Sequence, residues 1–77
     1  MKFTQRVIFY KVNDDNTVTF KVIDENNQPQ YFRSNARLKL LLELQELKQD
    51  TELIATIGVY YKKGVGLALQ LIEVAYE

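Results

Sequence analysis

Hydrophobic and polar residues alternate along much of the chain, which is the two-residue period of a β-strand. The clearest example is the segment 18–22, Val-Thr-Phe-Lys-Val, in which the apolar residues share one face and Thr19 and Lys21 share the other. β-branched and aromatic residues are frequent in these stretches, and turn-forming Asn, Asp and Gly residues separate them. We therefore predict five strands, at residues 3–12, 18–23, 30–33, 53–62 and 65–75.

A helical period replaces this alternation between residues 36 and 49, where there is neither Gly nor Pro and most residues are strong helix formers. Ser34 or Asn35 is expected to cap the N-terminus of this helix. Leu38 and Leu42 lie off its apolar stripe, so the helix is either broadly buried or has an apolar edge left for a partner. The stripe itself consists of Ala36, Leu40, Leu44 and Leu47, with Leu41 at its edge.

The predicted order of elements is three strands, one helix and two strands within a single domain, residues 1–77. This is the order of a five-stranded OB barrel, whose helix closes one end. The alternative is an open antiparallel α+β sheet with the helix on one face. We favour the barrel, because both final strands carry apolar residues on both faces and Gly58 would suit a bend or bulge.

The composition excludes several classes of chemistry. The 77 residues include no cysteine and no histidine, which leaves neither a disulfide framework nor a thiolate or imidazole metal site. No secretory signal or membrane-spanning run is present, so we expect a cytoplasmic protein that does not enter the membrane.

Catalysis is not expected from the remaining polar residues, and no cofactor is predicted. The adjacent carboxylates Asp14-Asp15 and Asp24-Glu25 lie in Asn-rich segments, where they are best explained as turn formers. The segment 13–16 does not have the ligand spacing of a calcium loop, and Gly64-Val65-Gly66 is too short a motif to indicate a phosphate site.

A binding surface is the remaining possibility. Ten basic and ten acidic residues cancel, yet the basic residues are concentrated in two segments, 2–12 and 30–39. Aromatic faces that stack bases beside cations that contact phosphates form the usual site for single-stranded nucleic acid. The predicted binding residues are Arg6, Tyr10, Lys11, Lys21, Tyr31, Arg33, Arg37, Lys39, Tyr60, Lys62 and Lys63.

Tyr60 is the best of the aromatic candidates, because it is out of phase with the apolar positions of its strand. The competing interpretation is that the tyrosines belong to the core and that the cations merely cover solvent-facing positions. Arg37 and Lys39 lie at the helix start, where the helix dipole disfavours positive charge, so we hypothesise that they extend the basic surface of Arg33.

The C-terminal run YYKKGVGLALQLIEVAYE resembles the closing hairpin of small OB-fold single-stranded-DNA-binding proteins of bacteriophages and mobile elements. The resemblance implies an aromatic strand, a short Gly-containing turn and a final strand, and it implies binding of single-stranded DNA. Within this hairpin we expect Leu67, Leu69 and Leu71 to be core residues. The residues that match are Tyr60, Tyr61, Gly64, Val65, Leu67, Leu69 and Val74.

Two functions follow from these patterns. The first is a non-catalytic module that binds single-stranded DNA or RNA. The second is a protein-interaction module on the same fold, such as a phage- or plasmid-type adaptor or inhibitor, which the neutral charge and the apolar helix edge favour. We expect a homodimer, with Leu38, Leu42, Ile72 and Val74 at the joint.

Overall fold

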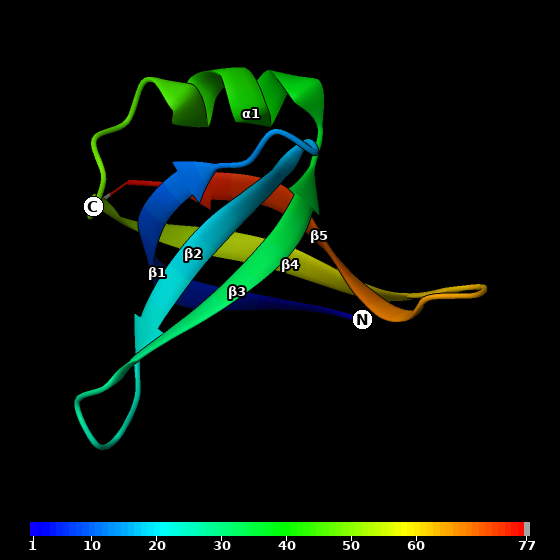
Figure 1. Cartoon of the computed structure of the whole chain (residues 1–77), viewed down its shortest axis with the longest axis horizontal. Helices are drawn as coiled ribbons and strands as arrows, with labels where there is room; N and C mark the ends of the chain where they lie inside the picture. Colours follow the sequence, from blue (N-terminus) through cyan, green and yellow to red (C-terminus); the bar gives the residue numbers. More distant parts are fainter. Residues whose placement is uncertain (77) are drawn as a thin grey trace.

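A computed structural model describes residues 1–76, which form five strands and one short helix (Figure 1). The elements are β1 (Lys2–Val12), β2 (Thr17–Ile23), β3 (Pro29–Ala36), α1 (Leu38–Gln45), β4 (Glu52–Lys62) and β5 (Gly66–Ala75). The sheet closes on itself in the order β1-β2-β3-β5-β4. The prediction of a five-stranded OB-like barrel is therefore confirmed, and the open-sheet alternative is wrong.

Neighbouring strands pair antiparallel except at the junction of β3 and β5, which is parallel. This junction, which we call the seam, consists of the two residue pairs Asn35–Gln70 and Ala36–Leu71. The long β4–β5 hairpin extends beyond the barrel and projects to the right in Figure 1. A closed sheet therefore joins here through very little pairing.

The core lies inside the barrel and under the helix. Val18 and Phe20 are fully buried, as their alternation predicts, and the rings of Phe20 and Phe32 lie 5.7 Å apart. Leu41 and Leu44 are the buried residues of α1, which covers one end of the barrel (Figure 1). The buried hydrophobic residues are Val7, Phe9, Val18, Phe20, Leu41, Leu44, Leu53, Ala55, Ile57 and Leu71.

The helix is shorter than the predicted span of residues 36–49, because tertiary pairing overrides helix propensity at its start. Ala36 belongs to β3, where it pairs with Leu71, and Arg37 occupies the N-cap position with extended backbone and no side-chain cap. Neither Ser34 nor Asn35 is the cap, and both lie in β3. The part of the chain that the structure describes contains no helix with the length and hydropathy of a membrane span.

The β4–β5 hairpin corrects the prediction for the final strand. Leu71 is fully buried and Leu69 is half-buried, but Leu67 is 77% exposed and Val65 is 69% exposed. Apolar and polar residues continue to alternate in the part of this hairpin that extends beyond the barrel. The apolar side of that part therefore has no core to cover. The expectation that Leu67 belongs to the core is wrong.

Gly58 lies where two strands approach closely. A Cβ at this position would come within 3.2 Å of the Ile72 Cδ1 atom, and a register shift between Thr56 and Ile57 marks a bulge just before it. This irregularity agrees with the expectation that Gly58 lies at a bend or bulge.

Candidate nucleic-acid interface

The outer face of β1–β3 carries Tyr10, Lys21, Tyr31 and Arg33, which together we call the tyrosine face. Lys21 lies directly opposite Tyr31 on the neighbouring strand. The rings of Tyr10 and Tyr31 meet edge to face, with centroids 5.1 Å apart and an interplanar angle of 68°. Tyr31 is 52% exposed. Its ring therefore packs against Tyr10, lies beside the Lys21 ammonium group and is still accessible to a ligand.

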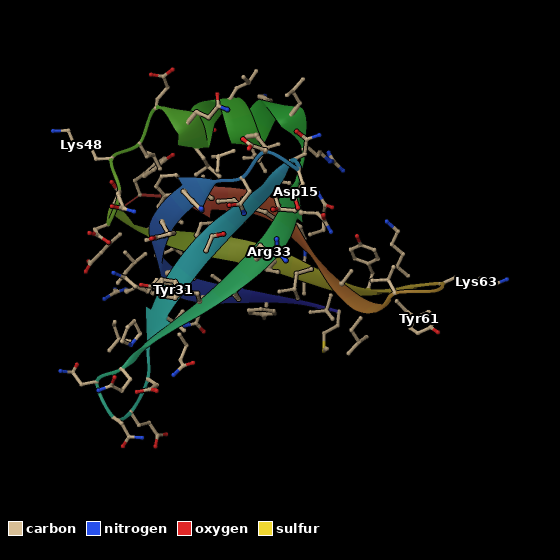
Figure 2. The ribbon with its side chains drawn as sticks, in the orientation of Figure 1. Asp15, Tyr31, Arg33, Lys48, Tyr61 and Lys63 are labelled. Carbon is tan, nitrogen blue, oxygen red and sulfur yellow. The ribbon has the colours of Figure 1, made fainter. Side chains whose placement is uncertain are left out.

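Two carboxylates accompany the cations of the tyrosine face. The Lys21 Nζ atom lies 3.0 Å from Asp50 Oδ1, and this hydrogen bond raises the pKa of Lys21. An Arg33 Nη1 atom lies 3.7 Å from Asp15 Oδ2 (Figure 2). The pKa of Asp15 is lowered mainly by the hydrogen bond that it accepts from the Thr17 hydroxyl, and less by Arg33. A phosphate on this face would therefore have to replace or share these internal partners.

Arg6 and Lys11 border the tyrosine face. Arg6 lines a shallow hollow of about 300 Å³ together with Lys21 and Glu52. Lys11 is exposed on β1 and lies opposite Thr19. Four predicted cations therefore lie on the tyrosine face or at its border, together with the three carboxylates of Asp15, Asp50 and Glu52.

The remaining predicted residues lie elsewhere. Tyr60, Lys62 and Lys63 belong to the β4–β5 hairpin, and Figure 2 shows Lys63 at its tip, well away from Tyr31. Tyr60 is 38% exposed, and its hydroxyl accepts a hydrogen bond from Asn35 Nδ2 at 3.2 Å. The predicted residues thus divide between a face and a projecting arm.

Arg37 and Lys39 form a third location at the start of α1. Both are outside the strands, because Arg37 is the N-cap and Lys39 lies in the first helical turn. Asp50 lies beyond the helix in a left-handed backbone conformation with φ 72° and pairs with Lys21. The role of Arg37 and Lys39 as an extension of the Arg33 surface stays a prediction.

Sequence reasoning missed the carboxylate partners and the bonding of Asn35. Asp50 and Lys21 are 29 positions apart, so no local pattern indicates their ion pair. Asn35 donates to both the Tyr60 hydroxyl and the Leu69 carbonyl, each at 3.2 Å. The exposed ring of Tyr61 was missed for another reason. Tyr61 is in phase with the apolar positions of β4, and this phase predicts a side chain that points inward.

The acidic turns have structural partners. Asp24 Oδ1 accepts the backbone N–H groups of Asn26 and Gln28, each at 2.9 Å, which confirms its interpretation as a turn former. Within residues 1–76 no group of three or more acidic side chains is arranged to hold a metal ion.

Comparison of the chain with protein-family models, with curated proteins and with solved structures finds no match. No relative therefore assigns a role to any residue of the tyrosine face. The geometry and charge of this surface are what support a function.

Proposed function

We propose that the chain binds single-stranded nucleic acid on the tyrosine face. A base stacks on Tyr31, and phosphates on either side contact Lys21 and Arg33. The observation that supports this proposal is the half-exposed Tyr31 ring, positioned by Tyr10 and adjacent to Lys21. A ring that is already held in place loses little conformational entropy when a base stacks on it.

The proposed ligand is single-stranded because an unpaired base can reach an exposed ring, whereas the bases of a duplex are already stacked on one another. The electrostatic contribution is small. If Arg6, Lys11, Lys21 and Arg33 each contacted one phosphate, the affinity would fall with salt with a log–log slope no steeper than about −2.8. The chain has no net charge to add to these contacts.

Fluorescence anisotropy of a labelled oligothymidine, titrated with the protein at low salt, tests this proposal. Tyr31→Ala removes the stacking platform and should weaken binding by about 5- to 150-fold, which corresponds to about 1–3 kcal/mol for one base. Tyr76→Ala is the matched control, since Tyr76 is 47% exposed and donates a hydrogen bond to Glu43 of the helix rather than lying on the tyrosine face. Absence of binding, or equal loss in both variants, would refute the proposal.

A second test removes one of the carboxylates that pair with the cations, a change that should strengthen binding. Asp50→Asn removes the charge that holds Lys21, and Asn tolerates the left-handed backbone at this position. We expect tighter oligonucleotide binding and a steeper salt slope. Weaker binding in this variant would mean that Asp50 positions Lys21 for the ligand instead of competing with the phosphate.

Several expectations from the sequence stay predictions. These are the relationship to phage-type DNA-binding proteins, the protein-interaction alternative, the lack of catalysis, the cytoplasmic location and the homodimer. Of the predicted dimer residues, Leu38, Leu42 and Ile72 are exposed, whereas Val74 packs partly against the core and has less surface to offer.

A further inference from the structure

A second surface of the barrel lies between β3 and β5, on the far side of the seam from the helix. The two strands pair only at the seam and then diverge, which Figure 1 shows as a wedge between the green and orange strands. Within the described residues 1–76, residues 29–34 of β3 and 66–69 of β5 therefore have no partner strand on this side. A groove of about 460 Å³ occupies the wedge. Asp15, Arg33, Ser34 and Asn35 line it from the β3 side, and Val65, Leu67 and Leu69 line it from the β5 side.

The backbone of β5 presents hydrogen-bonding groups to this groove. The Leu69 carbonyl accepts from the Asn35 side chain on the β3 side, so it does not point toward β4. Its cross-strand partner Val59 donates its N–H to Met1 O, on the β1 side, at 2.7 Å. Val59 and Leu69 are therefore a non-hydrogen-bonded pair of the antiparallel ladder.

The same orientation recurs two residues along the strand. The β4–β5 register is unbroken from Gly58–Gln70 to Lys62–Gly66, so Leu67 has the orientation of Leu69. The N–H and C=O groups of Leu67 both point into the groove. At Leu69 the side-chain amide of Asn35 already donates a hydrogen bond to this edge from the β3 side.

The two sides of the β5 edge differ in chemistry. The side that continues the barrel interior carries Leu67 and Leu69, and Leu67 has no core to cover within the monomer. The outer side carries Lys62 on the neighbouring strand. Across the groove lie Arg33 and its partner Asp15, 3.7 Å apart, so Lys62 and Arg33 together leave this side with an excess of positive charge. Between residues 53 and 72 the chain contains Lys62 and Lys63 but no acidic residue.

We propose that the groove binds an extended polypeptide segment that adds to the edge of β5, with apolar side chains alternating with acidic ones. The backbone of the segment pairs with Leu67, its apolar residues cover Leu67 and Leu69, and its acidic residues face Lys62 and Arg33. Alternating donors and acceptors on an open strand edge match a peptide backbone, whereas a DNA backbone offers only acceptors to such an edge. The groove shares Arg33 with the tyrosine face but none of its other residues, and the proposal does not depend on the function proposed there.

The experiment uses the full chain and a fluorescein-labelled peptide of about eight residues in which valine and glutamate alternate. We expect saturable binding in anisotropy titrations. In two further peptides, either the valine or the glutamate amides are N-methylated. Because only one edge of an added strand pairs with β5, one methylated peptide should bind at least about tenfold more weakly and the other should be little affected. A valine–lysine peptide should also lose at least about tenfold, because its charges oppose Lys62 and Arg33.

The protein variants act on the same edge. Leu67→Pro removes the N–H that faces the groove and leaves the β4 ladder intact, so it should abolish peptide binding. Leu67→Val retains both the N–H and an apolar side chain and should bind normally. Tyr31→Ala should leave the peptide titration unchanged, which separates this site from the tyrosine face. The peptide series tests the proposal even if Leu67→Pro fails to fold.

Four results would overturn the proposal. These are no peptide binding, equal effects of the two N-methylated peptides, self-association that disappears in Leu67→Pro, and displacement of the peptide by an oligothymidine whose own binding is lost in Leu67→Pro. The third would identify a second copy of the chain as the occupant of the groove. The fourth would assign the groove to nucleic acid.

Discussion

Asn35 connects three strands at the point where the barrel has least pairing. Its side-chain amide donates one hydrogen bond to the Leu69 carbonyl of β5 and one to the Tyr60 hydroxyl of β4, each at 3.2 Å. Its backbone belongs to one of the two residue pairs of the seam. Asn35→Ala removes both side-chain bonds and leaves the backbone pairing available, so this substitution isolates what the amide contributes to barrel closure.

The expected loss follows from the number of bonds. Each hydrogen bond contributes about 0.5–1.5 kcal/mol, so Asn35→Ala should lower the free energy of unfolding by about 1–3 kcal/mol. Tyr60→Phe removes only one of the two bonds and should cost about 1 kcal/mol. For a domain of this size each kcal/mol corresponds to about 4–8 °C in Tm.

Urea unfolding followed by far-UV circular dichroism measures these losses. Asn26→Ala is the matched control, because Asn26 is exposed in a turn and its hydrogen bond to Asp24 comes from the backbone N–H, which the substitution keeps. Its stability should change by less than about 0.5 kcal/mol. If Asn35→Ala costs no more than Asn26→Ala, the amide does not hold the seam, and the short backbone pairing is sufficient by itself.

Further predictions concern the core, the turns and pH. Phe20→Ala empties the centre of the barrel beside Phe32 and should cost about 3–5 kcal/mol in the same urea assay. Gly66→Ala places a Cβ on a residue with φ 99° and should cost about 1–2 kcal/mol, although nothing lies within 4 Å of the added atom. The backbone N–H of Gln28 and the Gln30 side chain lower the pKa of Asp24 below its usual 3.8. The Asp24 carboxylate therefore adds stability that is present above pH 3.8 and is lost as the pH falls through its lower folded-state pKa. Unfolding curves measured across that range should show a smaller loss of stability in Asp24→Asn; an unchanged loss would contradict the assignment.

The order of the elements could be predicted because each strand carries its own two-residue period and each turn its own Asn, Asp or Gly residues. The same two-residue period led to the wrong prediction that Leu67 is a core residue. Alternation shows which residues share a face of a strand, but not whether that face has a core to cover, and the β4–β5 hairpin outgrows the barrel. The helix start was misplaced because pairing of Ala36 with Leu71, far along the chain, is stronger than local helix propensity.

The candidate site could be predicted only as a set of residue types. Lys21, Tyr31 and Arg33 are brought together because they have the same phase on neighbouring strands, and this phase is visible in the sequence. The ion pair of Lys21 with Asp50 depends on where the loop after the helix returns to the barrel, which no local pattern specifies. Sequence reasoning therefore identified the cations of the surface and missed the charges that oppose them.

The short seam also has a consequence for the folding pathway. The β1–β2, β2–β3 and β4–β5 pairs connect strands that are adjacent in sequence. Two junctions are long-range: β1–β4 is held by seven residue pairs, whereas the seam has only two and gains least when it forms. We expect it to form after the rate-limiting step. Substitution of Asn35 should then accelerate unfolding and leave the folding rate nearly unchanged, with a φ-value near zero. The native barrel would open first at this junction, in brief excursions that separate β3 from β5 while the hairpins persist.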